Sequence, residues 1–492
     1  MVSEYFIGVD VGTGSVKAVA VSVDGTVLSN AQVHYHHTEG YGPFEHDPEH
    51  IYSAFVQVLR KLVKEIHGRP VTVSLSTAMH SLILVGKNNA SLTPMITWAD
   101  DRAHEIADRA RKSSIGEMLY EGTGTPVHAM SPLFKIIWFR ENAPDLFHAA
   151  QKFISIKEYI WFKLFGEYEV DFSIASASGL MNISRCRWDT NALELAEISS
   201  EKLSSLVGIY HARNKMHATA SRDLEFDPDT RFLIGSSDGC MANLGSLATS
   251  SGTAALTIGT SGALRIASKN PIYNFDAMTF NYRLDEQTFI CGGPTNNGGI
   301  VLKWYVEQLL GRSLENIKDY DDILTKVRTV TPGSNGLIFL PYLLGERAPH
   351  WNSHASGVFF GITIQHTQAH FTRAVIEGIG MALYDIAQAM NLREDGVNVI
   401  HVSGGFVHSK EWLQILADIF GCKLALMNTT DASALGAAYL AMKEAGVFSE
   451  KNLLKKRPVD EIIPDPGTHL IYQKHYEIFR ELYNNLKGFM KN

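Results

Sequence analysis

Cysteine is scarce in this chain: four residues, Cys186, Cys240, Cys291 and Cys422, are scattered over 492 positions. No two of them form a Cys-x-x-Cys pair, which argues against a disulfide scaffold or a compact zinc module. The chain also lacks an uninterrupted apolar run of about 18 residues, so no membrane span is expected. Its start lacks the basic and then apolar layout of a signal peptide. We therefore expect a soluble, cytoplasmic protein with no membrane partner.

Positive charge is in deficit, since 44 Lys and Arg residues stand against 52 Asp and Glu residues, for a formal net charge of −8. Nucleic-acid binding needs a basic surface that neutralises phosphates, so no nucleic-acid partner is expected. A local pocket can still bind an anion against the overall sign. Hydrophobic residues at 45% and charged residues at 20% are ordinary globular values, which argues against a disordered or coiled-coil protein. The length predicts two large domains or a few smaller ones.

The first motif is the run Asp-Val-Gly-Thr-Gly-Ser-Val-Lys at residues 10–17, between two short β-rich segments. Glycines let a backbone approach phosphate oxygens closely, and the amides of such a turn form an anion-binding nest. Mg²⁺ prefers few carboxylates together with phosphates. The spacing matches neither a Walker A loop nor a Rossmann fingerprint, and a plain hairpin turn is the alternative interpretation. The candidate phosphate ligands are Thr13, Gly14, Ser15 and Lys17, and the candidate magnesium ligand is Asp10.

A similar strand–turn–strand pattern recurs at residues 253–267, about half a chain later. Its turn, Gly-Thr-Ser-Gly at 259–262, offers the same phosphate-binding chemistry through Gly259 and Thr260. Two related α/β domains, residues 1–248 and 249–492, facing each other across a cleft would explain the repeat. Glycine turns are common in β-hairpins, however, and the repeat alone fits that explanation equally well.

A third small-residue junction is Ser-Gly-Gly at 403–405, which follows the apolar segment 397–402 and precedes a helix expected near Lys410. Bare backbone at a helix N-terminus accepts a phosphate or a ring, so Gly404 and Gly405 are candidate nucleotide ligands. The alternative is a tight strand-to-helix turn with no ligand.

Asp238 is the candidate catalytic base, because it follows the apolar run 232–234 on a small-residue segment that we expect to be a loop. A carboxylate there can accept a proton from a substrate hydroxyl, while phosphoryl transfer otherwise needs mainly positioning and charge neutralisation. An Asx turn is the alternative. Two further strand-like segments end just before candidate substrate residues, namely Met79 and His80 after the first and Trp98 after the second. Side chains of this kind suit a polyol or sugar acid, although each is more often structural when taken singly.

Together these segments resemble the FGGY carbohydrate kinases, members of the actin/Hsp70/sugar-kinase superfamily. The resemblance covers roughly residues 5–445 and implies an α/β fold of two ribonuclease H-like domains flanking an ATP-binding cleft. It also implies a small-molecule substrate and allows a homodimer. The segments that carry it are two phosphate loops, an adenosine loop and two long gapped signatures, at 10–15, 259–261, 403–405, 130–142 and 357–377.

The resemblance implies roles for individual residues, with ATP and Mg²⁺ as the required small molecules. Asp238 would take the proton from the substrate hydroxyl, and Asp10 would help bind Mg²⁺. One departure is Gly239, where many members carry Gln, so a side-chain donor is missing. The remaining implied contacts are Thr13, Gly14, Ser15 and Thr260 to phosphates, Gly299, Lys303, Gly405 and Ser409 to ATP, and Met79, His80 and Trp98 to the substrate.

Several stretches are most similar to the bacterial gluconate kinases of this family, at residues 78–81, 96–102, 122–128 and 156–159. The resemblance therefore implies ATP-dependent phosphorylation of D-gluconate to 6-phospho-D-gluconate. The substrate carboxylate would meet a basic side chain, with Arg102, Lys135, Lys157 and His80 as the candidates. The alternatives are xylulose kinase or another sugar kinase of the family and, from another class, a superfamily ATPase that phosphorylates no sugar.

Overall fold

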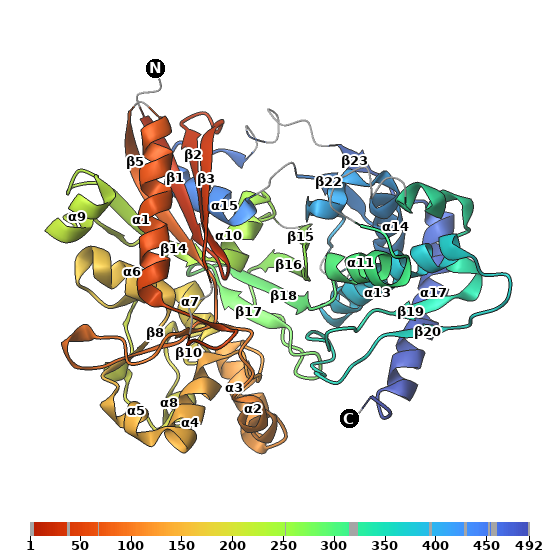
Figure 1. The fold of residues 1–492 in the computed structure, drawn as a ribbon, viewed down its shortest axis with the longest axis horizontal. Coiled ribbons are helices and arrows are strands. Elements are labelled where there is room, and N and C mark those ends of the chain that lie inside the picture. The colour runs from red at the N-terminus through yellow and green to blue at the C-terminus, as the bar shows by residue number, and fades with distance from the viewer. Residues whose placement is uncertain are drawn as a thin grey trace.

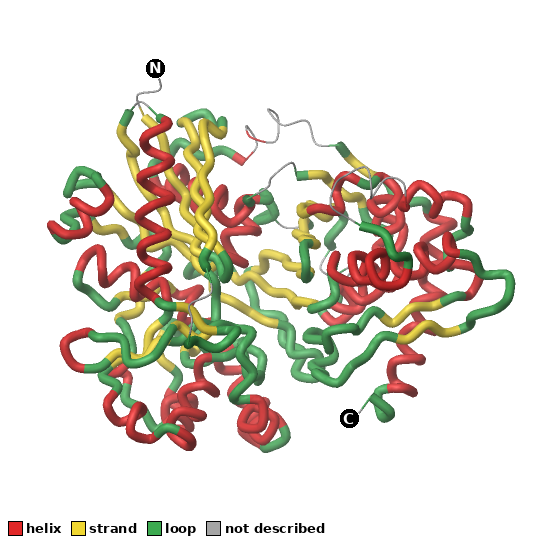
Figure 2. Tube along the Cα trace, in the orientation of Figure 1, coloured by secondary structure: helices red, strands yellow, loops and turns green. Residues whose placement is uncertain are grey.

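Two β-sheets with helices on their faces lie side by side along the long axis of the molecule (Figure 1). The structure is a computed structural model that describes residues 4–36, 40–66, 68–250, 252–313, 323–392, 396–427, 431–450, 453 and 460–490. The strands form the centre of each half, and the helices and loops surround them (Figure 2). The predicted boundary near residue 248 falls between α10 and β15, in the connection between the halves, and the independence of the two segments stays a prediction.

The N-terminal sheet has six strands and contains the first predicted hairpin. Its centre is β1, which pairs antiparallel with β2 and parallel with β5. The register sets Asp10 opposite Lys17, so the turn predicted to bind phosphate joins these two strands. In sheet order the strands are β13 (Ala212–Arg213), β14 (Arg231–Ser237), β5 (Arg69–Thr77), β1 (Glu4–Val11), β2 (Ser15–Ser22) and β3 (Val27–His34).

Helix α1 (Pro48–Glu65) covers one face of this sheet, as the 3.6-residue apolar period predicts. Asp47 caps it by accepting a hydrogen bond from the backbone N–H of Glu49, and Pro48 occupies the first turn, where its missing N–H costs nothing. The apolar stripe is buried in the core of the sheet. The other helices of this half are α2 (His104–Arg111), α3 (Ser114–Thr123), α4 (Pro132–Asn142), α5 (Pro144–Ala149), α6 (Ile156–Phe165), α7 (Phe172–Ala177), α8 (Thr190–Ala196), α9 (Ala218–Leu224) and α10 (Asp238–Gly245).

The C-terminal sheet repeats the connections of the first. Its strand β15 pairs antiparallel with β16 and parallel with β21, just as β1 pairs with β2 and β5. In sheet order the strands are β17 (Phe280–Arg283), β18 (Phe289–Thr295), β16 (Gly262–Ser268), β15 (Thr253–Ile258), β21 (Val399–Gly404), β22 (Lys423–Leu426) and β23 (Glu461–Ile462). The helices of this half are α11 (Gly299–Trp304), α13 (Gln368–Ala389), α14 (Lys410–Phe420), α15 (Ala432–Glu444) and α17 (Pro466–Leu486).

Five two-stranded pairings supplement the main sheets. Four belong to the N-terminal half, and the fifth belongs to the C-terminal half. They are β4 (Glu45–His46) with β7 (Met95–Ile96), β6 (Ile83–Val85) with β8 (Lys152–Ile154), β10 (Met181–Asn182) with β11 (Arg187–Trp188), β9 (Glu169–Asp171) with β12 (Ser205–Val207), and β19 (Ile338–Leu340) with β20 (Val358–Phe360).

The two halves are joined by more than their connection, because α15 packs against α10 and against β1 of the N-terminal sheet (Figure 1). Glycines allow this close approach: a Cβ on Gly436 would overlap the carbonyl of Met241, and one on Gly245 would overlap that of Ala432. The strand β17 also reaches the N-terminal half, where the amide of Asn281 donates to the carbonyl of Gly124. The halves therefore share a buried apolar core.

No helix in the described part of the chain combines the length and the apolar character that a membrane crossing would need. This finding agrees with the sequence, which has no long apolar run.

Candidate active site

A cavity of about 310 Å³ lies between the two halves, and both contribute to its wall. The N-terminal half supplies the ends of β5 and β14 and the segments around Trp98 and Met130. The C-terminal half supplies the β15–β16 hairpin, β17, β18 and Arg347. The polar lining residues are His80, Trp98, Asp238, Thr257, Ser261, Arg265, Tyr282 and Arg347, and Met79 lies beside them.

Among the described residues of this lining Asp238 is the only acid, and it lies at a helix terminus rather than on the loop that we expected. It is the first residue of α10, directly after β14, and Ser237 caps the helix by accepting a hydrogen bond from the amide of Cys240. The prediction of a loop was wrong because the small residues 235–239 also suit a tight strand-to-helix junction. The helix N-terminus places partial positive charge beside the carboxylate, and its Oδ1 accepts a 2.8 Å hydrogen bond from the amide of Gly239.

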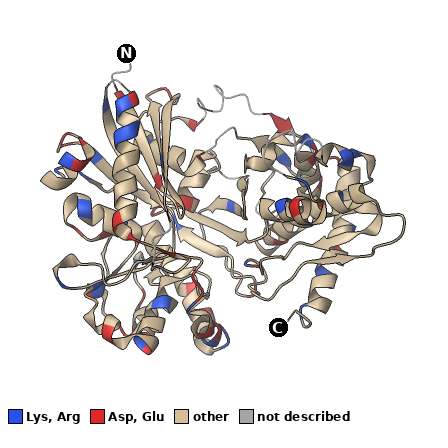
Figure 3. Ribbon diagram, in the orientation of Figure 1, with Lys and Arg blue, Asp and Glu red and all other residues tan. Residues whose placement is uncertain are grey.

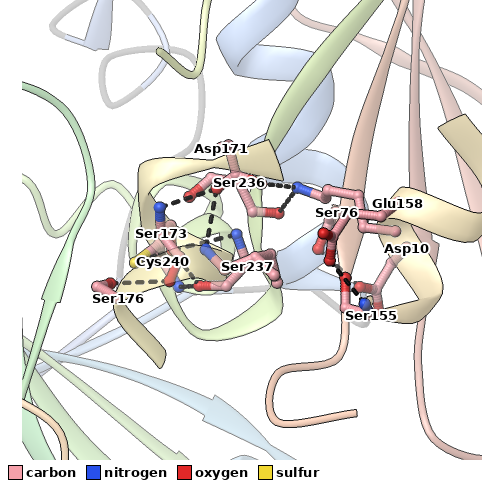
Figure 4. Close-up of polar contacts among 12 residues, drawn as sticks. Asp10, Ser76, Ser155, Glu158, Asp171, Ser173, Ser176, Ser236, Ser237 and Cys240 are labelled. Carbon is pink, nitrogen blue, oxygen red and sulfur yellow. Dashed lines mark hydrogen bonds and ion pairs between the residues drawn. The ribbon is translucent and has the colours of Figure 1, made fainter. Parts of the chain in front are cut away.

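A buried polar network contacts the junction between β14 and α10 (Figure 4). Lys157 donates to Asp171 Oδ2 at 2.7 Å and to the carbonyl of Ser236 at 2.8 Å, and neither charged side chain is exposed. Asp171 also caps α7. Ser173 on that helix donates to the hydroxyl of Ser237 at 2.6 Å. The strand end, the cap and the first residue of α10 are thereby held together.

Burial raises the pKa of Asp238, while Arg265, the amide of Gly239 and Lys157 act in the opposite direction. Burial likewise raises the pKa of Asp10 to about 7, with a further contribution from the charge of Asp238. Ser76 donates a 2.7 Å hydrogen bond to Asp10 (Figure 4). Asp10 lies near the end of β1 and Asp238 directly follows β14, and these two strands flank β5 in the N-terminal sheet.

The first predicted phosphate loop lies at this edge of the sheet. The hydroxyl of Thr13 accepts a 3.1 Å hydrogen bond from the indole of Trp98, so a predicted phosphate ligand contacts a predicted substrate ligand. Gly14 is exposed with open space at its Cα. Ser15 accepts a hydrogen bond from Gln32. Lys17 forms a 2.7 Å ion pair with Asp431 at the start of α15, which ties the loop to the C-terminal half.

The second predicted loop and α11 come together on the other side. The amide of Gly299 donates to the carbonyl of Gly259 at 2.7 Å, so the start of α11 sits on the β15–β16 turn. Thr260 is exposed at the tip of that turn. Lys303, one turn along the helix, is exposed and pairs with Glu307 at 3.7 Å.

The third predicted junction differs from the expected direct strand-to-helix turn. A short 3₁₀ turn, Gly405–His408, lies between β21 and α14. Gly404 ends β21 with φ of 117°, a conformation that favours glycine, and Gly405 is exposed. Ser409 is buried and caps α14 by accepting from the amide of Trp412 at 3.2 Å. A ligand would therefore meet the backbone of Gly405 more readily than the hydroxyl of Ser409.

The three predicted substrate residues Met79, His80 and Trp98 all line the cavity. His80 Nδ1 donates to the carbonyl of Ala177 at 2.7 Å, so Nε2 is left to accept from Tyr282 at 3.1 Å. Burial lowers the pKa of His80 to about 3, so the ring is neutral at physiological pH. Its backbone lies in the left-handed region at φ 64°, a strain that is found preferentially at functional sites.

Of the four basic residues that the sequence offered as partners for a substrate carboxylate, His80 alone is among the described residues that line the cavity. His80 is neutral. Lys157 is paired with Asp171, and Arg102 donates to both Asp100 and Glu45. Lys135 is fully buried and donates to the carbonyl of Met130, outside the cavity lining.

Two arginines that the sequence reasoning missed face the cavity instead, Arg265 and Arg347. A signal for Arg265 was present, because it follows the second glycine turn on a strand whose alternate residues, Ala263 and Arg265, share one face. Arg347 had no such signal, since it lies in an irregular segment far along the chain. Tyr282, on β17, also lines the cavity and was not anticipated.

The chain matches the models of both halves of one family, the N-terminal domain over residues 5–245 and the C-terminal domain over residues 254–445. The chain belongs to the FGGY family of carbohydrate kinases. It is therefore a carbohydrate kinase with the two-domain α/β fold of the actin/Hsp70-like superfamily, and the predicted family and fold class are confirmed.

Individual FGGY proteins match the whole chain. A gluconokinase of Bacillus subtilis is 36% identical over 501 residues, which cover 100% of this chain and 97% of that protein. The crystal structures of a gluconate kinase and of a ligand-bound xylulose kinase, both from Lactobacillus acidophilus, each superpose with a TM-score of 0.93 at 33% identity, covering 98% of either chain. Overall similarity of fold therefore does not separate these two substrates.

Proposed function

We propose that this FGGY kinase transfers the γ-phosphoryl group of ATP to the terminal hydroxyl of D-gluconate, giving 6-phospho-D-gluconate. The observation that carries the proposal is the cavity itself, in which one carboxylate, Asp238, stands among Arg265, Arg347 and a neutral His80. An acid beside a helix N-terminus suits proton removal, and excess positive charge suits an anionic sugar. The likeness to a gluconokinase over the full chain supports the same substrate.

In this proposal Asp238 accepts the proton of the attacking hydroxyl, and the Lys157–Asp171 network holds it in place. The 10–17 loop and the 259–262 loop face the phosphates from opposite halves, and the backbone near Gly299 and Gly405 receives the nucleoside. Closure of the halves around the cavity excludes water and so limits ATP hydrolysis.

Asp10 is the residue that would hold Mg²⁺. In the described part of the chain no three His, Cys, Asp or Glu side chains gather into a metal cluster. A single buried carboxylate near Asp238 fits Mg²⁺ all the same, because this ion keeps waters and phosphate oxygens as most of its ligands. When bound, Mg²⁺ would neutralise charge on the transferring phosphate.

A neutral sugar such as xylulose is the second candidate, favoured by the equal similarity to the xylulose kinase structure. Sugar-independent ATP hydrolysis is the candidate from another class. The confirmed carbohydrate kinase family argues against the latter.

A coupled assay of ADP release tests the proposal with gluconate, xylulose, ribulose, glycerol and fuculose as acceptors. We expect gluconate to give the highest kcat/KM, and a clear preference for a neutral sugar would contradict the substrate. Asp238→Asn should lose about 10²–10⁴-fold in kcat, the usual contribution of a general base, with ATP binding retained. Near-normal turnover of this variant would contradict the role of Asp238.

A further inference from the structure

The two cavity arginines have guanidinium nitrogens without protein partners. Nη1 of Arg265 and Nε of Arg347 are both buried and donate to no hydrogen-bond acceptor among the described residues. Buried polar groups in folded proteins are nearly always paired. Both arginines line one cavity, so an anionic ligand in that cavity can supply acceptors to their guanidinium groups.

The protein itself offers these arginines little compensating charge. Asp238 is the single acid in the described lining of the cavity. Glu346, the neighbour of Arg347, is occupied by Thr295, the amide of Asn296 and the side chain of Asn297. Two cations facing one carboxylate leave a net positive site, which an anionic ligand would neutralise.

Arg347 is held in place for such a contact. Arg347 Nη2 donates to the carbonyl of Thr295 at 3.1 Å, and its guanidinium lies 4.9 Å from the centre of the Trp98 ring. Trp98 in turn donates to Thr13. A guanidinium that is stacked and anchored at one nitrogen presents the others in a fixed direction, which suits a carboxylate.

Arg265 owes its place to the departure at position 239. A Cβ on Gly239 would lie 3.5 Å from Arg265 Nε and 2.9 Å from the Met79 methyl group. A longer side chain at this position would compete with the guanidinium for the same space. Where the family resemblance implies a glutamine, this chain has Gly239, and an arginine from the opposite half occupies the space beside it.

We propose that Arg265 and Arg347 together bind the carboxylate of the sugar acid and so select an acidic over a neutral substrate. This inference rests on the proposed function for the identity of the acid. It adds the residues that recognise the charge, both of which come from the C-terminal half. The C-terminal half would thereby bind the charged group of the substrate, and the N-terminal half would contact the reacting hydroxyl.

Binding of D-gluconate and of its neutral amide, D-gluconamide, tests the inference by calorimetry on the full-length protein. The variants are Arg265→Met and Arg347→Met. Arg283→Met is the matched control, because Arg283 also has a buried Nε without a partner but lies outside the cavity. Each cavity variant should weaken gluconate binding about 10- to 100-fold, the value of a lost charge-assisted hydrogen bond, and change gluconamide binding far less.

Arg265→Lys and Arg347→Lys keep the charge and serve where the methionine variants do not fold. We expect them to retain part of the preference for the acid. The inference would be overturned if the ratio of gluconate to gluconamide affinity were unchanged in the variants of both Arg265 and Arg347. An equal loss of gluconate affinity in Arg283→Met would also overturn it. Failure of the proposed function is a separate result, namely that the wild-type enzyme binds gluconate but does not phosphorylate it.

Discussion

At the scale of single residues, Gly239 determines what stands beside the candidate base. Its lack of a side chain leaves the space next to Asp238 open to Arg265, which arrives from the other half of the molecule. The cation beside Asp238 therefore comes from β16 of the C-terminal half, and the glycine at position 239 leaves room for it.

Gly239→Gln should shift the enzyme from acidic towards neutral substrates. The new side chain would displace Arg265 and so remove a charge-assisted contact, which predicts a loss of about tenfold or more in kcat/KM for gluconate relative to a neutral hexitol. Gly239→Ala is the control, because its Cβ meets chiefly the flexible end of Met79. An unchanged substrate ratio in Gly239→Gln would contradict the account of Gly239.

The sequence predicts the cavity residues that belong to short local motifs, but not those that only tertiary structure places at the cavity. Met79, His80, Trp98 and Asp238 all follow apolar strands, and all line the cavity. The sequence could not decide among the basic candidates, because folding pairs Lys157 and Arg102 with acids of the protein itself. Whether Lys157 is free or bound to Asp171 depends on helix α6 meeting the end of β9, which no local pattern reveals.

At the scale of elements, two contacts position the site: the hydrogen bonds from α6 and α7 to the end of β14, directly before α10, and the crossing of α10 with α15. The first is polar and the second apolar. Both act on the same short helix, whose first residue is Asp238. Disturbing either should move the base even though neither touches the substrate.

Lys157→Met should destabilise the protein by about 3–5 kcal/mol, because it leaves the carboxylate of Asp171 buried without its partner. Lys163→Met is the matched control on the same helix. Its ion pair with Glu49 is partly exposed, so a loss of about 0–1 kcal/mol is expected. Urea unfolding measures the free energy of unfolding of both variants. Equal losses would show that the buried ion pair stabilises the protein no more than the exposed one.

Gly436→Ala should destabilise the α10–α15 crossing, because the added methyl group would overlap the backbone carbonyl of Met241. A backbone contact cannot rotate away, so we expect a cost of about 3 kcal/mol, at the upper end for overpacking. Gly208→Ala is the control, since nothing lies within 4 Å of its Cβ position. Thermal unfolding compares the two, and a Gly436→Ala protein as stable as the control would contradict the close packing.

At the scale of the whole molecule, the acid surplus is a surface property and the site is a local exception. Acidic and basic side chains are interspersed over both halves (Figure 3). The cavity between them carries two arginines and one acid. A net charge of −8 therefore coexists with a site for anions, as local fields allow.

The two-sheet architecture was predictable from the repeated glycine hairpins and the family signatures, whereas the crossing of α15 was not. Strand, turn and helix periods are local, so β1, β2, α1, β15 and β16 follow from the sequence. The partner of a helix is a long-range property. Nothing in residues 432–444 indicates that they pack on the sheet of the N-terminal half.

This crossing predicts that the two halves unfold together. One buried cluster contains Phe6 and Met241 from the first half with Tyr282, Leu435 and Tyr439 from the second. Separating the halves would expose this apolar surface to water, which costs about 25 cal/mol per Å². We therefore expect one calorimetric transition for the full chain, with equal calorimetric and van't Hoff enthalpies. Two resolved transitions would show that the halves are independent and that the shared cluster contributes little to their cohesion.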